Sequence, residues 1–461
     1  MARPSSEDLA IITSLSRELG RKRKQHDELA KAYDGTRQVE IIGMSLDQRM
    51  RGFEFPLNWC RVTVDSIENR QDVRALIRPG SEDRQDDPAL REAWDANDMD
   101  AQAPLLHRDN LIQGHGVVAV STNDEDREHP LITVESSRSM IARVHPAKRR
   151  MEAALRLYSD PEKAWAPDYA TLYLPEKTLW LSRENSRAWE VTDVDEHKLG
   201  RVPVVMSLNR RMAGQWAGES EMTDVIGPMD MATRTLMNLQ MAMEIAAIPR
   251  RWAANVARDS FVGPDGQPKD SWSAAMDAVW AVAGRADGKE PKFGQFDAAD
   301  PAGFVGVIRA LAEQCSSITG LPVRYFGQNT ANPATEGAIK ADEARLIRNV
   351  ERKNAELGAV WGWVLALYER FRTGEWLDPS DRIAIDWHDP ATPTIAQRMD
   401  ATVKAHQAKI ISREGAWDEL GFSEPRKVKE RANFAAELND PTIQLANSLL
   451  NGSTDAALGN A

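Results

Sequence analysis

The chain has 461 residues, of which 42% are apolar and 28% are charged, and its formal net charge at pH 7 is −12. This length allows two to four domains, and the acidic balance disfavours proteins that grip nucleic acid, because tight phosphate binding needs a basic face. No run of about 18 apolar residues occurs and the first ten residues lack a basic-then-apolar order, so neither a membrane span nor a secretory signal is expected.

The N-terminal part of the sequence predicts helices. Residues 5–34 place apolar side chains near one helical face. Further helices are expected over 56–76 and 88–112, where Pro104 either begins a new helix or bends this one. The basic run RKRK at 21–24 is flanked by acidic residues, so it is interpreted as a solvated helix face rather than a nucleic-acid patch.

From residue 116 the hydrophobic period shortens to that of strands. Turn residues separate the apolar runs at intervals of about eight to twelve residues, which is typical of an antiparallel sheet. The runs are GVVAVST, LITVES, MIARVH, EAALRLYS, ATLYLP, KTLWLS, AWEVTD and VPVVMS. They predict an antiparallel sheet region that ends near residue 207.

Residues 218–251 predict a helix about 31 Å long that Pro228 begins and Pro249 ends. Its apolar side chains surround most of the axis, so the helix must be covered on several sides. It is either the core helix of a large domain or a helix packed against its own chain and against neighbouring subunits. Its methionines fit the second alternative, because flexible thioethers fill imperfect interfaces.

A compact module is expected after this helix. Residues 252–300 are rich in Gly, Pro and Asp around a short helical run, SWSAAMDAVWAV. A second helix is expected over 301–320, between Pro301 and Gly320. One helix out, a compact module and one helix back predict a stalk with a tip.

A small, uncharged polar segment, residues 321–335, precedes the longest predicted helix. Pro333 suits the first helical position, and apolar residues at heptad-like spacing continue to about Phe371. Such a helix would be about 58 Å long, more than a compact domain usually needs, so it requires an extended body to lie along. Gly358 and Gly362, one turn apart, mark the close approach of another element.

The C-terminal part predicts one strand and several helices. RIAIDWHDP, residues 382–390, predicts the strand. Helices are expected between 393 and 440, one of them capped by Ser412 and ended by Gly421. Residues 441–461 lack apolar content and predict a frayed tail.

Motifs for catalysis are absent from the sequence, which contains no P-loop, dinucleotide-binding glycine pattern, nucleophile elbow or HExxH. Asp386 and His388 would share one face of a strand, which makes a metal-dependent hydrolase conceivable. No second cluster supplies further ligands, so a turn stabilised by Asp and Pro is favoured, with neither metal nor cofactor. Cys60 and Cys315 lack metal-ligand spacing, which predicts free thiols in a reducing cytosol.

Five motifs follow one another along most of the chain. They are LGRVPVVMSLNR (199–210), GESEMTDVIGPMDMATRTLMN (218–238), IPRRW (248–252), SITGLPVRYFG (317–327) and NPATEGAIKADEARL (332–346). Their order and spacing resemble those of the portal proteins of tailed bacteriophages, most closely the Gp6-like branch seen in phages of actinobacteria.

This resemblance implies an α+β, mainly helical fold with the portal architecture of wing, stem, clip and crown, an antiparallel β region and a very long helix. By position, the parts are the wing with its helices and sheet (1–217), a stem helix (218–251), the clip (252–300), a second stem helix (301–320), the tunnel loop (321–335), the long wing helix (336–373), a wing strand (374–392), the crown helices (393–440) and the C-terminal tail (441–461).

The resemblance also implies what the protein does. Such portals are rings, usually dodecameric, at one capsid vertex, and double-stranded DNA passes through them non-specifically during packaging and ejection. The implied partners are the terminase large subunit, a head–tail adaptor, and the major capsid and scaffold proteins. The implied locations are the virion and, during assembly, the host cytoplasm. Neither enzymatic activity, a cofactor nor a membrane is implied, and terminase would supply the ATPase that the chain lacks.

In this interpretation the tunnel loop faces the passing DNA with Gln328, Asn329, Thr330 and Asn332. Their polar contacts are individually weak and exchange easily with water, which suits a duplex that must slide. The nearby Arg324 departs from a wholly neutral rim. From the residues alone, a plain helix-capping loop explains the same segment equally well.

The same interpretation expects the stem to form the interface between subunits, through Leu236, Met237, Met241 and Ile245. A permanent interface of this kind is large and apolar. A third hypothesis, beside the channel and the hydrolase, is a non-channel virion scaffold or adaptor with an extended helical stalk.

Overall fold

The computed structural model divides into two compact units, residues 1–390 and residues 391–461, and each is described by itself. The residues described are 3–39, 57–78, 80, 86–159, 168–183, 188–247, 251–255, 290, 292–295, 301–328, 336–378, 382–391, 395–422 and 424–438. Within these ranges, no helix combines the length and the apolar character that crossing a bilayer requires.

The first helix, α1 (Ser6–Asp34), forms as predicted. The Ser5 hydroxyl accepts a hydrogen bond from the Asp8 amide at 3.1 Å and so caps the N-terminus. Gly35 ends the helix in the left-handed region, with a φ of 76°.

The next predicted helix is wrong in its second half. Residues 56–76 contain helix α2 (Trp59–Glu68) followed by strand β1 (Val73–Ile77). The strand prevails because it pairs antiparallel with β12 (Ala384–Trp387), a partner so distant along the chain that no local pattern reveals it.

The predicted helix over 88–112 is two helices, α3 (Pro88–Ala96) and α4 (Met99–Gln113). The break falls at Asp98, whose φ of 50° lies outside the right-handed helical region. Pro104 therefore lies inside α4 and does not begin a helix.

All eight predicted strands are present, in two antiparallel sheets. The smaller sheet has the order β3 (Leu131–Glu135), β2 (His115–Ser121) and β9 (Val204–Leu208). The larger sheet has the order β4 (Met140–Val144), β5 (Met151–Tyr158), β6 (Tyr169–Tyr173), β7 (Thr178–Ser182) and β8 (Glu190–Asp195). Each strand of the larger sheet pairs with its neighbour in sequence, as short turns favour.

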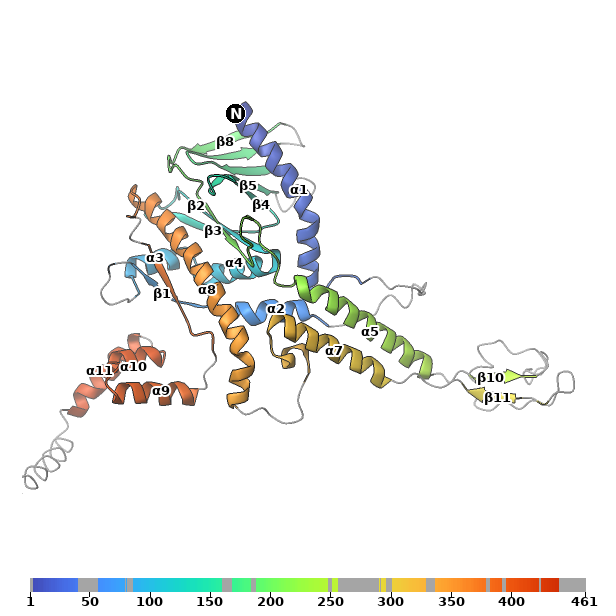
Figure 1. The fold of residues 1–461 in the computed structure, drawn as a ribbon. Helices are drawn as coiled ribbons and strands as arrows, with labels where there is room; N and C mark the ends of the chain where they lie inside the picture. The colour runs from blue at the N-terminus through green and yellow to red at the C-terminus, as the bar shows by residue number, and fades with distance from the viewer. Residues whose placement is uncertain are drawn as a thin grey trace, which may run out of the picture. The chain divides into compact units, whose positions relative to one another are not determined.

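The two sheets stack between helices (Figure 1). On one side, α1 buries Ile12, Leu15 and Leu19 against the larger sheet. A second apolar layer lies between the two sheets. The other face of the smaller sheet packs against α4 and the long helix α8 (Glu336–Thr373), so the layers run helix, sheet, sheet, helix.

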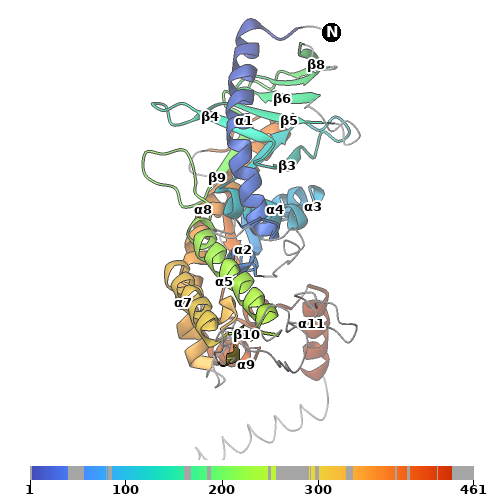
Figure 2. The same cartoon turned by 90° about the vertical axis from the view of Figure 1, so that its right-hand side faces the viewer.

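The predicted stalk is an antiparallel pair of helices, α5 (Thr223–Ala247) and α7 (Pro301–Thr319), which lie side by side in Figures 1 and 2. Between them in sequence, β10 (Arg251–Ala254) and β11 (Lys292–Gln295) form an antiparallel ladder. The helical run predicted inside this module, and Pro249, lie outside the described residues.

The start of α5 corrects one expectation. The helix begins before Pro228, which lies inside it. Ser220 starts the turn earlier, because its hydroxyl accepts the Met222 amide at 3.2 Å and its carbonyl accepts the Thr223 hydroxyl at 2.9 Å.

The longest predicted helix is confirmed as α8. Its apolar stripe is buried from Leu346 to Tyr368. Both predicted close approaches are present, since a Cβ atom on Gly362 would lie 2.3 Å from the Ile383 carbonyl oxygen and one on Gly358 would lie 3.3 Å from the Trp387 side chain. The glycines therefore let the β12 segment lie directly on α8.

The second unit contains three helices among its described residues, α9 (Ile395–Gln407), α10 (Arg413–Glu419) and α11 (Glu424–Leu438). As predicted, Ser412 caps α10, and Gly421 follows it with a φ of 75°. The predicted tail, 441–461, falls in the part of the chain that is not described.

Candidate functional site: the helix pair and the loop before the long helix

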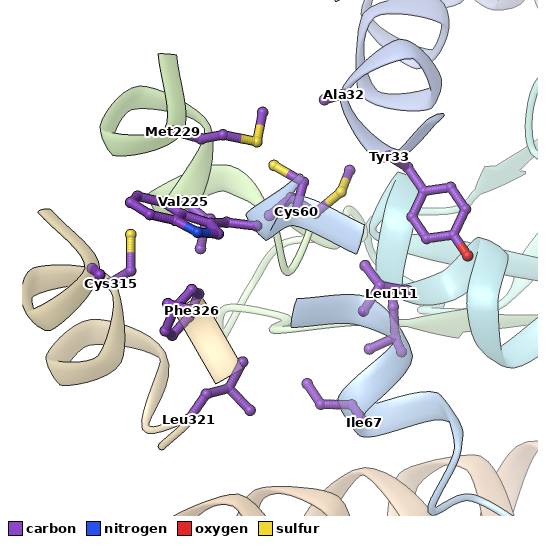
Figure 3. Packing of buried hydrophobic residues seen from close by; sticks show 14 of the residues in the cluster. Ala32, Tyr33, Cys60, Ile67, Leu111, Val225, Met229, Cys315, Leu321 and Phe326 are labelled. Atoms are coloured by element: carbon purple, nitrogen blue, oxygen red, sulfur yellow. The ribbon is translucent and has the colours of Figure 1, made fainter. Parts of the chain in front are cut away.

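The helix pair, α5 and α7, joins the rest of the first unit through a dense apolar core (Figure 3). Trp59 of α2 meets Phe326, in the short 3-10 helix η3 (Val323–Phe326), edge to face at 5.8 Å between ring centroids. Burial raises the pKa of the Cys60 thiol to about 12 and that of Cys315 to about 11. Both cysteines are free, as predicted, and protonated at neutral pH.

A buried ion pair connects α8 to the segment that leads into α5. The Lys353 ammonium donates to the Glu221 carboxylate at 2.8 Å and to the side-chain oxygen of Asn209. Both charged side chains are at most 10% exposed. Burial alone would raise the pKa of Glu221, but Lys353 and the Asn209 amide hold it below its ordinary value.

The backbone around this pair is packed without room for side chains. The Asn209 amide donates to the Gly114 carbonyl at 2.8 Å, and the Asn209 side chain donates to the Glu219 carbonyl at 2.8 Å. A Cβ atom on Gly218 would lie 1.8 Å from the Gly114 oxygen, which only glycine permits. We call Gly114, Asn209, Gly218, Glu221 and Lys353 the junction, because sheet, helix pair and long helix meet there.

A second polar cluster joins η3, which precedes the loop, to α8, which follows it. Arg70, at the end of α2, donates to the Tyr325 hydroxyl at 3.1 Å and to Glu343 at 3.4 Å. Tyr325 donates in turn to Glu343 at 2.9 Å, and Arg324 is paired with both Asp342 and Glu343. We call these five residues the loop anchor.

The loop anchor explains how a loop that is otherwise uncharged accommodates the charge of Arg324. Its guanidinium faces two carboxylates of α8, so its charge is neutralised within the chain. Arg70 also donates to the Pro390 carbonyl at 3.2 Å, which ties the end of the β12 segment to the same cluster.

Of the four predicted loop residues, Gln328 is the one that the structure describes. It is half-buried and follows Gly327, which turns the chain with a φ of 82°. Asn329, Thr330 and Asn332 fall in the undescribed stretch 329–335, so their surroundings stay a prediction.

The predicted interface residues lie in the second half of α5. Leu236, Met237 and Met241 are each half-buried within a single copy of the chain. Ile245 belongs to α5, but its side chain is among those not described.

Around these positions the helix pair presents a broad apolar surface. Met231 and Met243 of α5 are 51% and 53% exposed, and Val305 and Val307 of α7 are 57% and 48% exposed. Large exposed apolar patches are typical of places where a partner binds.

The hydrolase alternative finds little support in the geometry. Asp386 is paired with Arg74 of β1, whose Nε donates to the carboxylate at 2.7 Å. His388 is exposed, and its backbone amide donates to the Asp72 carbonyl at 2.9 Å, which continues the strand pairing. Across the described ranges, no three His, Cys, Asp or Glu side chains cluster closely enough to hold a metal ion.

Neither polar cluster was predicted. The sequence neighbours of Lys353, Asn209 and Glu221 are themselves largely polar. Polar residues in such stretches are usually exposed to solvent. The signal that was available is position, because Asn209 and Glu221 fall within two of the five motifs and Tyr325 falls within a third.

Comparison with known proteins identifies the family of this chain. The family model described as "Phage portal protein, SPP1 Gp6-like" matches residues 18–440. The portal protein of Mycobacterium phage D29 is 34% identical over 402 residues, 85% of this chain and 81% of the relative. That of Mycobacterium phage L5 is 33% identical over 409 residues, covering 87% and 82% of the two chains.

The solved structures that match this chain include chains from gene transfer agent particles. A chain from the neck of the empty particle covers 86% of this chain and 98% of its own length, with 16% identity and a TM-score of 0.41. A chain from the native virion covers 86% and 93%, with 17% identity and a TM-score of 0.43.

The matches define a class and then a family. The protein is a structural component of a virus particle. It belongs to the SPP1 Gp6-like family of phage portal proteins, as the matched residues and the two mycobacteriophage relatives show, and is a portal protein of a tailed phage. The resemblance predicted from the motifs is thus confirmed.

Proposed function

We propose that copies of this chain close into a dodecameric ring, whose bore carries double-stranded DNA into the capsid and out of it. The observation that supports the ring is the apolar surface of the helix pair, which one copy leaves half covered. A contact between two different surfaces of identical subunits either closes into a ring or grows into a fibre. Permanent interfaces of this kind bury more than about 2,000 Å² of mostly apolar area.

In this proposal α5 and α7 are the stem, and Leu236, Met237, Met241 and Ile245 lie between subunits. The module 252–300 is the clip that binds first the terminase large subunit and then a head–tail adaptor. Residues 1–217 and 336–392 form the wing, and residues 393–440 form the crown. Capsid and scaffold proteins surround the ring, which assembles in the host cytoplasm and ends in the virion.

In this proposal residues 321–335 are the tunnel loop, and its part after Gly327 faces the bore. The neutralised Arg324 supports this role, because each free cation would add phosphate attraction and slow a sliding duplex. Gln328, Asn329, Thr330 and Asn332 contribute polar contacts that water replaces easily. The protein itself is not an enzyme in this proposal, and terminase drives the DNA.

Electron microscopy of the purified protein tests the ring directly. Wild-type protein should give annular particles with a central hole. Met241→Asp should give monomers, because a charge buried without a partner at an interface costs several kcal/mol, roughly 3–5. Met212→Asp is the matched control, since Met212 is 62% exposed and lies outside the helix pair.

The outcomes separate the alternatives. Annuli from wild type and Met212→Asp but not from Met241→Asp support the stem interface. Annuli from all three proteins place that interface elsewhere on the chain. A rod without a hole, seen for wild type under every condition, would instead favour the non-channel adaptor.

A further inference from the structure

The larger sheet ends in two edge strands. β4 and β8 are its outer strands, and neither pairs with a further strand within the described ranges. β5, β6 and β7 lie between them in the sheet, and Figure 2 shows β8 beyond β6. Four strand spacings of about 4.8 Å separate the two edges by about 19 Å within one copy.

One edge is basic. The turn between β4 and β5 carries Lys148, Arg149 and Arg150, all exposed. None of the three is paired with a carboxylate of the described chain. The turn has a defined shape, because the His145 ring nitrogen accepts from the amides of residues 147 and 148 at 3.1 Å each. We call residues 148–150 the basic turn.

The opposite edge is acidic. Glu190 and Asp193 of β8 and the following Glu196 are exposed, beside Val194 at 44% exposure. None of these three carboxylates meets a lysine or arginine in the described parts of the chain. We call residues 190–196 the acidic edge.

Protection of an open sheet edge is the simpler explanation of such charges. Charged side chains on an edge strand keep it from pairing with another sheet, and either sign serves that purpose. This explains charges on an edge strand, but it does not explain why the acidic edge and the basic turn carry opposite signs.

We infer that the acidic edge of one copy faces the basic turn of the next copy around the ring. The inference rests on the ring of the proposed function. A head-to-tail contact joins two different surfaces of the same chain, so those surfaces must be complementary. Opposite charges at the rim of an apolar interface speed encounter and fix register more than they add affinity. The helix pair would supply the apolar contact and the sheet edges its register.

Cross-linking of wild-type rings tests this contact without any substitution. A water-soluble carbodiimide activates a carboxylate, which a touching lysine then attacks to form an amide while the reagent leaves as a urea. Mass spectrometry of digested rings should find Lys148 joined to a carboxylate of the acidic edge. Lys148 lies between β4 and β5, three to four strand spacings or about 14–19 Å from β8 within one copy, so this zero-length link is expected between two copies. Rings that yield no such peptide would overturn the inference.

Charge exchange provides the second test, read as the fraction of protein in annuli at about 50 mM salt, where screening is weak. Lys148→Glu/Arg150→Glu and Glu190→Lys/Asp193→Lys should each raise the concentration for half-assembly about tenfold, because repulsion replaces attraction across the contact. The protein that carries all four changes should assemble like wild type.

The control reverses two charges elsewhere, Arg21→Glu/Lys24→Glu on an exposed stretch of α1, and should assemble normally. Circular dichroism confirms that each variant is folded. Annuli that form equally well from all variants, or four changes that fail to restore assembly, would overturn the inference and leave the ring intact. Wild-type protein that never forms annuli would overturn the ring and the inference together.

Discussion

At the scale of single residues, the largest energies lie in the buried polar groups rather than in the many exposed ion pairs. Lys353 and Glu221 are almost fully buried and satisfy one another, whereas Arg348 and Glu351 on the same helix are an exposed pair, with the Arg348 side chain 85% exposed. A buried pair is costly to break from one side, because the remaining charge stays in a medium that solvates it poorly.

Lys353→Met is therefore expected to lower the free energy of unfolding by about 3–5 kcal/mol, because Glu221 loses its cation. Arg348→Met should change it by less than about 1 kcal/mol. Urea unfolding at pH 7 measures both. Adding Glu221→Gln to Lys353→Met should recover part of the loss. If Lys353→Met and Arg348→Met change the free energy of unfolding equally, the junction is solvated.

Two histidines give the protein a defined pH dependence. Burial lowers the pKa of His107 to about 3, and burial together with the neighbouring His26 lowers that of His115 to about 4. In the unfolded chain both titrate near 6.5. Below that pH the unfolded state binds more protons, so these histidines reduce stability as the pH falls from 6.5 towards 4.

His115→Gln should accordingly make stability less sensitive to acid than it is in the wild type. The difference in slope should approach about 1.4 kcal/mol per pH unit between pH 6 and pH 4.5. Urea unfolding of both proteins across this range measures it. Parallel curves for the two proteins would mean that His115 takes up its proton in the folded state as readily as in the unfolded chain.

At the scale of elements, the sequence predicted what local periodicity determines. The helices α1, α7 and α8 and all eight strands of the two sheets follow from spacing, capping residues and turn residues. Strand β1 could not be predicted in this way, because its strand character depends on pairing with β12 far along the chain. The junction and the loop anchor could not be predicted either, because their members lie on separate elements and become neighbours only in the folded chain. Sequence resemblance identified the family, but of the four residues predicted to face DNA the described ranges include Gln328 alone.

The contact of α8 with the β12 segment gives an element-scale prediction. Gly362→Ala should destabilise the protein although alanine favours helices by about 1 kcal/mol, because its Cβ would meet the Ile383 oxygen at 2.3 Å. Gly227→Ala in α5 should be neutral or stabilising, since no atom lies within 4 Å of the added carbon. Thermal unfolding of the two variants compares them. A stabilised Gly362→Ala protein would mean that β12 moves away from α8 at little cost.

At the scale of the whole molecule, the junction and the loop anchor stabilise two different parts of the proposed portal. The junction fixes the helix pair to the body of the chain, so the apolar surface of α5 and α7 is presented in one orientation. The loop anchor joins Tyr325 of η3 to Glu343 inside α8, so it bridges the segment between these two elements. In the proposed portal, assembly and DNA contact would therefore be carried by separate parts of the chain.

Deleting Gln328–Asn332 should consequently leave ring assembly unchanged while DNA packaging or retention falls, because the anchor stays intact and only the segment proposed to face the duplex is lost. Annuli in electron micrographs and packaged DNA per particle measure the two properties. Glu343→Gln is the complementary variant, since it weakens the hold on Arg324 and Arg70 and leaves the loop sequence complete. If the deletion variant packages DNA as well as the wild type, residues 328–332 do not face the duplex. If the variant also forms no annuli, the loop contributes to the contact between subunits, and the proposed separation between assembly and DNA contact is wrong.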